Sequence, residues 1–217
     1  MAIMWIKFVI VAVIGYFLGN ISSGILIAKL YGIRDIRKQG SGNAGTTNVL
    51  RTLGWVPSVL TLVGDCLKGL FAALIGKWLG GDIGMLVGGT MAVIGHDFPV
   101  IFGFKGGKGI ATSLGLIIVI NPWIALALLA LVLLIVGFSR YMSVGSLCAA
   151  VLYPILTAIL QRGKEYYLAF VLFAVFASLL TIFCHRANVA RLFRREENRL
   201  DFEKISQIKS KIKNFKK

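Results

Sequence analysis

Long apolar runs separated by short polar segments recur along the whole chain. A helix needs about 20 apolar residues to cross a bilayer, and fewer where the bilayer thins. The pattern predicts an all-α polytopic membrane bundle of seven transmembrane helices, at about residues 3–28, 55–78, 83–103, 110–121, 123–138, 144–161 and 166–184. The first run resembles a signal peptide in having Lys7 before an apolar stretch, but it lacks an A-x-A-like cleavage site. We therefore expect it to remain as a span.

Residues 110–138 allow two interpretations. One kinked helix would leave six spans, whereas a turn at Asn121–Pro122 makes seven, and proline disfavours helix in the residue before it. Charge favours seven, because an outside N-terminus and a cytoplasmic C-terminus then place most Lys and Arg residues in the cytoplasm. The outer side keeps only Lys7, Lys77, Arg162 and Lys164.

The composition argues against an ordinary soluble domain. Of the 217 residues, 57% are hydrophobic and 15% are charged, and the mean hydropathy is +0.82, whereas soluble domains are about 25% charged. The net charge of +15 would suggest nucleic acid in a soluble protein, but here the cations lie mostly at the ends of apolar runs. We therefore expect no nucleic acid, and anionic lipids of the cell membrane as the bulk partner. The chain divides into an integral membrane domain, 1–195, and a basic cytoplasmic tail, 196–217.

Four short polar segments fall on the cytoplasmic side in the seven-span arrangement. They are residues 41–51, 105–109, 140–146 and 185–188, which combine small or polar residues with Lys, Arg or His. Glycine lets backbone N–H groups approach a ligand closely, and the cations supply charge. The pattern indicates chemistry on a phosphate-bearing, lipid-related molecule.

Several side chains in these segments have both a functional and a structural interpretation. Arg51 can hold a phosphate bidentately, and Lys108 precedes a helix whose N-terminus also attracts an anion. Lys108 does not belong to a P-loop, because Phe102 and Gly109 break that pattern. The structural alternative for residues 41–51 is a glycine-rich connection in which Asn48 or Thr47 caps the next helix. For Lys108 it is a positive-inside anchor, and for the last two segments it is helix caps or topology signals.

Absent motifs narrow the class of reaction. The sequence has no H-x-x-x-x-D acyltransferase box, no G-x-S-x-G nucleophile elbow, and no paired carboxylates for Mg²⁺ in the polar segments. We therefore expect no metal and no cofactor. Asp65 and Lys68, three residues apart in a predicted span, either pair with each other or reach toward the cytoplasmic cavity. The rival classes are a small-anion transporter or channel and a non-catalytic scaffold, but the nearly apolar outer half favours an enzyme with a one-sided site.

Taken together, the polar segments resemble the motifs of the bacterial acyl-phosphate-dependent glycerol-3-phosphate acyltransferases, an integral membrane family. The resemblance rests on residues 41–51, Gly95–His96 with 104–112, 139–146 and 185–188, and it covers about residues 5–195. Thr46 stands where that family is expected to have alanine. The segment after Arg195 lies beyond the resemblance.

The resemblance implies that a fatty acyl group moves from acyl phosphate to the 1-hydroxyl of sn-glycerol 3-phosphate, giving lysophosphatidic acid and phosphate, the first acylation of phospholipid synthesis. It implies a cytoplasm-facing site without a cofactor, and a soluble enzyme that produces acyl phosphate is a further candidate partner. The residues expected to carry the reaction are Ser41, Arg51, Lys108, Ser143, His185 and Asn188. Those expected to bind substrate or shape its site are Gly42, Asn43, Asn48, His96, Lys105, Gly106, Gly107, Gly109, Arg140 and Ser146. Since no carboxylate base is evident, we hypothesise that a substrate phosphate accepts the hydroxyl proton and that His185 orients or hydrogen-bonds a phosphate.

Overall fold

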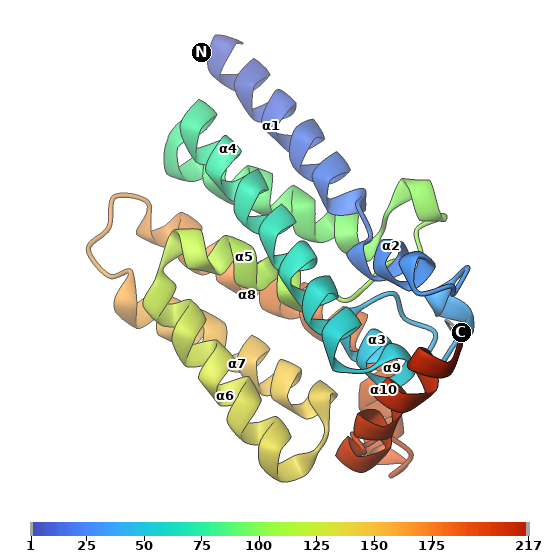
Figure 1. Ribbon diagram of the computed structural model, residues 1–217. Helices are drawn as coiled ribbons and strands as arrows, with labels where there is room; N and C mark the ends of the chain where they lie inside the picture. Colours follow the sequence, from blue (N-terminus) through green and yellow to red (C-terminus); the bar gives the residue numbers. More distant parts are fainter. Residues whose placement is uncertain (1, 216–217) are drawn as a thin grey trace.

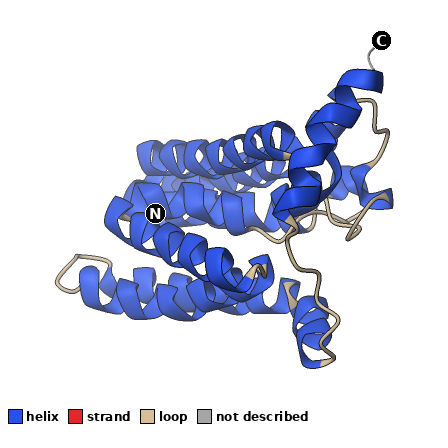
Figure 2. Cartoon of the chain, turned by 60° about the horizontal axis from the view of Figure 1, so that its bottom comes forward, coloured by secondary structure: helices blue, strands red, loops and turns tan. Residues whose placement is uncertain are grey.

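The computed structural model describes the backbone of residues 2–215 and the side chains of residues 2–208. Every regular element in that part of the chain is helical, which confirms the all-α class (Figure 2). The helices are α1 (Ala2–Asn20), α2 (Ser23–Leu30), α3 (Thr46–Leu53), α4 (Trp55–Asp97), α5 (Ile110–Ile120), α6 (Pro122–Ser139), α7 (Met142–Leu160), α8 (Tyr167–Cys184), α9 (Arg186–Phe193) and α10 (Phe202–Phe215) (Figure 1). Short 3₁₀ turns lie at Ile36–Lys38 and Val100–Phe102.

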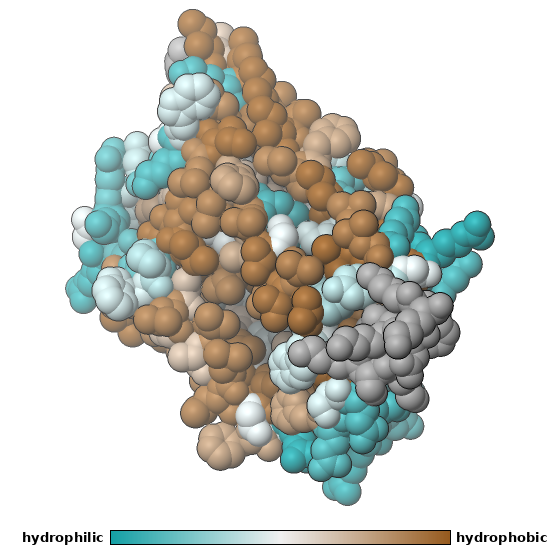
Figure 3. All heavy atoms as spheres, viewed as in Figure 1, coloured by the Kyte–Doolittle hydropathy of each residue, from teal (hydrophilic) through white to brown (hydrophobic). Residues whose placement is uncertain are grey.

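Five helical segments among the described residues are long and apolar enough to cross a membrane. They are Ala2–Leu30, Trp55–Phe102, Pro122–Ser139, Met142–Leu160 and Tyr167–Cys184, and Ile110–Ile120 is a shorter apolar helix. Figure 3 shows one face of the molecule, on which hydrophobic residues cover the sides of the helices. Hydrophilic residues gather at the bottom of this view, near α9 and the start of α10 in Figure 1. Such an exposed apolar flank is what a lipid-facing surface requires.

The first predicted span, 3–28, falls within the candidate span Ala2–Leu30, which the chain divides into two helices. The chain breaks between α1 and α2, where Ser22 has an extended conformation with φ −88° and ψ 94°. The break leaves carbonyl groups at the end of α1 without helical partners. The ammonium of Lys68 satisfies two of them, donating to the oxygens of Gly19 at 3.0 Å and Ile21 at 2.7 Å.

Helix α4 is a hairpin of two arms rather than one rod, and the arms correspond to the second and third predicted spans. The chain reverses at Gly80 and Gly81, where Gly81 has φ 62°, a conformation that glycine adopts without strain. The arms touch closely, since a Cβ at Gly76 would lie 2.1 Å from the carbonyl oxygen of Gly84. The second arm ends at Asp97, earlier than predicted, because Pro99 disfavours the helical conformation of the preceding residue.

The hairpin is the scaffold on which neighbouring helices pack through small residues. A Cβ at Gly15 of α1 would lie 2.4 Å from the Gly88 carbonyl oxygen on the second arm. A Cβ at Gly115 of α5 would lie 2.0 Å from the Cys66 carbonyl oxygen on the first arm. Small residues allow such close backbone approach, which is how membrane helices gain packing energy.

The predicted turn at Asn121–Pro122 is confirmed, because α5 and α6 are separate helices. The side chain of Asn121 caps α6, accepting from the N–H groups of Trp123 at 3.0 Å and Ile124 at 3.3 Å. Pro122 occupies the first helical position, where its missing N–H costs nothing.

Of the two alternatives for Asp65 and Lys68, the structure shows the pairing inside the first arm, and Asp65 lines the cavity described below as well. Lys68 Nζ lies 2.9 Å from Asp65 Oδ1, and both side chains are buried. His96 on the second arm joins them, with Nδ1 at 2.7 Å from Lys68 Nζ. The cluster therefore ties both arms of α4 to the end of α1.

Candidate active site

Residues from all four polar segments line one cavity of about 260 Å³. The predicted site residues on its wall are Ser41, Asn43, Asn48, Arg51, His96, Lys108, Gly109, Ser143, Ser146, His185 and Asn188. The segments are far apart in the sequence, so the expectation that they meet is confirmed. Which of these residues touches a substrate stays a prediction.

The cavity has an apolar half as well as a polar one. Helices α5, α6, α7 and α8 supply this wall through Leu114, Ile117, Leu128, Leu129, Val132, Leu133, Ala149, Tyr153, Phe173 and Ala177. Leu129 and Leu133 are also exposed on the bundle surface, so the apolar half reaches the flank. A space that joins cationic loops to an apolar wall suits a ligand with a charged head and an aliphatic chain.

Asn48 organises the first polar segment from within. Its Nδ2 donates to the carbonyl oxygens of Ile36 at 3.1 Å, Gln39 at 2.9 Å and Asn43 at 2.8 Å, while Oδ1 accepts from the N–H of Ser41 at 2.8 Å. The buried amide thus has its hydrogen-bonding capacity used by the loop. Asn48 shapes the loop rather than capping α3, whose N-cap is Gly45.

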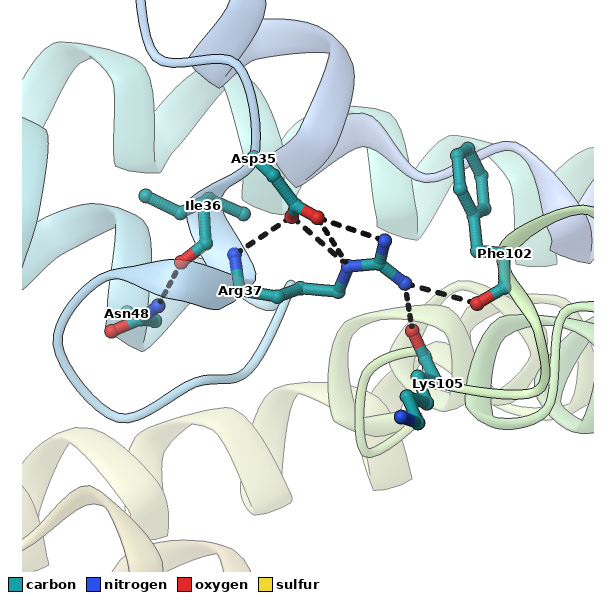
Figure 4. A network of polar contacts seen from close by, with 6 residues as sticks. All are labelled: Asp35, Ile36, Arg37, Asn48, Phe102 and Lys105. Atoms are coloured by element: carbon teal, nitrogen blue, oxygen red, sulfur yellow. Dashed lines mark hydrogen bonds and ion pairs between the residues drawn. The ribbon is translucent and has the colours of Figure 1, made fainter.

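Arg37, in the 3₁₀ turn before the first polar segment, connects that turn to the chain around the second polar segment (Figure 4). Its guanidinium pairs with Asp35 at 2.9 Å and donates to the carbonyl oxygens of Phe102 at 3.0 Å and Lys105 at 3.1 Å. This ion pair lowers the pKa of Asp35 below its usual value, mainly through the hydrogen bond from Arg37. Asn43 adds a second link, donating to the Gly106 carbonyl oxygen at 3.3 Å.

The glycines of the second segment pack on the end of α4. The N–H of Gly106 donates to Asp97 O at 3.3 Å, and that of Gly107 donates to His96 O at 3.0 Å. A Cβ at Gly107 would lie 1.9 Å from His96 Nε2, so no larger residue fits there without a shift. These N–H groups are occupied within the protein, so glycine here permits close packing of the loop.

Lys108 and Asn188 meet on the cavity wall. Lys108 Nζ donates to Asn188 Oδ1. Burial lowers the pKa of Lys108 to about 8, an effect that Glu197 opposes and that Arg191 and Arg51 reinforce. The ammonium is therefore charged at neutral pH but poorly neutralised, as an anion-binding group should be.

His185 is neutral at pH 7. Burial, followed by the nearby charge of Lys108, lowers its pKa to about 4. Its Nδ1 lies 2.8 Å from Thr181 O, and a carbonyl oxygen only accepts, so Nδ1 carries the hydrogen and Nε2 is left as an acceptor. The geometry favours a hydrogen bond from a hydroxyl group to Nε2 over direct contact with a fully ionised phosphate.

Arg51 reaches the cavity from α3. One of its terminal nitrogens, Nη2, donates to the carbonyl oxygen of Asn198 at 2.9 Å, whereas Nε is buried without a hydrogen-bond partner among the described residues. Burial lowers the pKa of this guanidinium, although arginine stays charged. Thr46, the expected departure from the family pattern, also lines the cavity, with a buried Oγ1 that lacks such a partner.

Five predicted site residues do not line this cavity. Gly42 and Lys105 border a separate polar depression beside Asp35 and Arg37. Gly106 and Gly107 pack on α4, and Arg140 lies over the ring of Phe202 at 5.9 Å. Their predicted contact with substrate stays a prediction, and the structure gives them roles in holding loops.

Glu197 is a charged cavity residue that the sequence interpretation missed. It lies in the predicted tail, yet it is 8% exposed and contacts Ser143, Asn188 and Arg191. The Glu196–Glu197 pair between basic residues was the available signal. No group of three potential metal ligands occurs among the residues that the structure describes, so the expectation of a metal-free reaction stays a prediction.

A sequence model of one family, described as glycerol-3-phosphate acyltransferase, matches residues 9–195 of the chain. The chain belongs to this family. Among its relatives, the glycerol-3-phosphate acyltransferase of Clostridioides difficile is 42% identical over 91% of this chain and 98% of its own length. The protein of the same name from Geobacter sulfurreducens is 41% identical over 88% of this chain and 96% of its own length.

Two solved structures of a family member share the fold. They are crystal structures of PlsY (YgiH), an integral membrane glycerol 3-phosphate acyltransferase, in a glycerol 3-phosphate form and a lysophosphatidic acid form. The first has a TM-score of 0.83 and 36% identity, covering 91% of this chain and 98% of that one. The second has a TM-score of 0.81 and 35% identity, covering 91% of this chain and 97% of that one. The chain is therefore an integral membrane protein of this fold.

Proposed function

We propose that the protein transfers a fatty acyl group from acyl phosphate to the 1-hydroxyl of sn-glycerol 3-phosphate, which yields lysophosphatidic acid and phosphate. The observation that carries the proposal is the two-part cavity, in which Arg51 and Lys108 border the same space as an apolar wall. A relative with forms named for glycerol 3-phosphate and lysophosphatidic acid supports the same acceptor and product.

The polar half supplies what two phosphate-bearing substrates need. Arg51 and Lys108 are cationic and only partly neutralised by the protein, so each can bind a phosphate oxygen. The apolar half, lined by Ile117, Leu128 and Phe173 among others, takes the acyl chain out of water. Holding both substrates in one space places the hydroxyl beside the acyl carbon.

Acyl phosphate is already activated, so the residues need to position and neutralise charge rather than form a covalent intermediate. The 1-hydroxyl oxygen attacks the acyl carbonyl carbon, the bond from that carbon to the phosphate oxygen breaks, and the departing phosphate takes the hydroxyl proton. Before the attack the hydroxyl donates its hydrogen bond to His185 Nε2, which orients it, and as the phosphate departs the hydrogen shifts to the phosphate oxygen, so His185 stays neutral throughout. Lys108 and Arg51 stabilise the charge that develops on the leaving phosphate.

The bundle crosses the membrane seven times in this proposal, with the N-terminus outside and the active site facing the cytoplasm. The hairpin form of α4 and the separation of α5 from α6 support the count. Helix α5 has 11 residues, a length of about 16 Å, so the bilayer must thin there or α5 must enter only partly. The cationic cavity then opens to the side where a soluble acyl-phosphate-producing enzyme would release its product.

The decisive experiment gives purified protein labelled glycerol 3-phosphate with acyl phosphate, an acyl thioester, or no donor. We expect labelled lysophosphatidic acid only with acyl phosphate, and equal yield with excess EDTA. Product from the thioester would overturn the donor assignment, and rescue of an EDTA-inhibited reaction by Mg²⁺ would overturn the metal-free mechanism. Failure with every donor, by protein that retains its Tm, would overturn the activity itself.

A further inference from the structure

The chain that follows α9 lies against the catalytic cavity. We call residues 197–205 the strap; it runs from Glu197 to Ile205, in the first turn of α10. Helix α10 itself reaches away from the bundle in Figure 2. The strap lies beyond residue 195, where the family match ends.

The carboxylate of Glu197 accepts hydrogen bonds from two predicted site residues and from Arg191. Oε1 accepts from Ser143 Oγ at 3.1 Å and from Asn188 Nδ2 at 2.7 Å. Oε2 accepts from Arg191 Nε at 2.8 Å. Burial alone would raise the pKa of Glu197, but these three bonds outweigh it and hold the pKa below its usual value, so the group is ionised.

Glu197 determines which way the amide of Asn188 faces. An amide has a donating and an accepting end, and Asn188 donates to Glu197 through Nδ2 while Oδ1 accepts from Lys108. If the amide turned over, Nδ2 would face the ammonium and Oδ1 would face the carboxylate, and both contacts would be repulsive. The carboxylate therefore fixes Asn188, and Asn188 in turn fixes the ammonium of Lys108.

The strap also holds the other cation of the site. The carbonyl oxygen of Asn198, the residue after Glu197, accepts from Arg51 Nη2 at 2.9 Å. Two adjacent strap residues thus contact Arg51, Ser143 and Asn188 directly. These three side chains come from α3, α7 and α9.

Several contacts anchor the strap to the bundle. The N–H of Leu200 donates to Arg140 O at 2.8 Å, and Phe202 stacks on Trp55 with ring centroids 6.0 Å apart. Leu200 and Ile205 are buried with Leu50 and Val136 in one apolar cluster. The strap is therefore a packed element, and its carboxylate has a defined position.

We propose that Glu197 is a positioning residue of acyl transfer, which acts through Asn188 to set Lys108 and through Ser143 to order the part of the wall that α7 supplies. The inference rests on the proposed function and deepens it, because it assigns part of the site to the segment beyond residue 195. An internal mimic of the phosphate is the competing role for a carboxylate beside cations. The contacts favour positioning, since Glu197 bonds Ser143 and Asn188 and forms its ion pair with Arg191, leaving Lys108 to Asn188.

The pH dependence separates positioning from simple structural support. The titratable and charged groups that act on the pKa of Lys108 are Glu197, Arg191, Arg51 and Cys184. Glu197 is the ionised anion of this set, and it favours the charged ammonium. Removing its charge lowers the pKa of Lys108, so the alkaline decline of kcat/KM moves to lower pH.

The test compares Glu197→Gln with the matched control Glu196→Gln, which makes the same change at the exposed neighbouring position. For Glu197→Gln we expect kcat to fall at least about tenfold from misplaced catalytic groups, KM for glycerol 3-phosphate to change little, and the alkaline decline to move to lower pH. Glu197→Asp, which keeps the charge, should restore the pH profile. The control should match wild type in all three measurements.

Unchanged kcat in Glu197→Gln, or a lower KM with unchanged kcat as expected for a phosphate mimic, would overturn the proposal. A lower kcat with an unmoved pH profile and a matching loss of Tm would also overturn it, because that result means structural support alone. If Glu197→Gln does not fold, Phe202→Ala weakens the strap anchor without touching the carboxylate and should lower kcat in the same way. Calorimetric titration with inorganic phosphate separates the positioning role of Glu197 from the proposed acyl transfer. If Glu197→Gln loses phosphate binding at a lower pH than wild type does, the positioning role is supported even if wild type transfers no acyl group.

Discussion

Replacing Lys108 by alanine removes an ammonium group that lines the cavity and contacts Asn188. A pair of unit charges about 4 Å apart is worth about 4 kcal/mol at an effective dielectric constant of about 20. Arg51 remains in the cavity and takes over part of this interaction. We therefore expect a loss of about 2.7 kcal/mol of transition-state stabilisation, which is about a hundredfold in kcat/KM.

The same residue predicts the alkaline side of the pH profile. Burial disfavours the charged form and lowers the pKa of Lys108 to about 8. The charged form is the one that binds phosphate, so kcat/KM of the wild type should fall as pH rises through that value. Lys108→Arg keeps its charge over this range, and its remaining activity should lack the decline.

The assay is release of lysophosphatidic acid from labelled glycerol 3-phosphate and acyl phosphate, with Tm measured for every variant. Lys38→Ala is the matched control, because it removes an exposed lysine that does not line the cavity. It should retain activity within about threefold, the scale of a weak exposed charge effect. Near-normal turnover by Lys108→Ala, or equal losses in both variants, would refute the assignment of the cavity as the phosphate site.

Two further predictions concern the loops and the topology. Arg37→Gln removes the hydrogen bonds to the Phe102 and Lys105 carbonyl groups and should lower kcat/KM by about tenfold, because the loops are then misplaced. The control Arg34→Gln, at an exposed neighbouring position, should match wild type. Full activity of Arg37→Gln would contradict this role of Arg37. In protein with its native cysteines replaced, Lys105→Cys should react only with reagent admitted to the cytoplasm and Lys164→Cys only with reagent outside; labelling both from the same side would contradict the seven-span topology.

Local chemistry was enough to predict most of the helices. The long apolar runs could only be satisfied in lipid as helices, since a lipid-exposed backbone must bond within its own segment. Asn121 and Pro122 mark a helix end and a helix start through their own side chains, and the structure has the cap at that position. The break between α1 and α2 was missed, because Lys68, more than forty positions away, satisfies the carbonyl groups at the break.

The sequence by itself determined that this is an all-helical membrane protein and that four of its polar segments combine small or polar residues with Lys, Arg or His. Apolar partitioning and local backbone preference depend on neighbouring residues, so both can be read along the chain. Only the tertiary structure decided that the N–H groups of Gly106 and Gly107 bond to α4 and that Glu197 bonds Ser143 and Asn188. Hydrogen bonds between distant segments depend on where packing brings those segments, and the residues next to Glu197 in the sequence do not specify which partners its carboxylate meets.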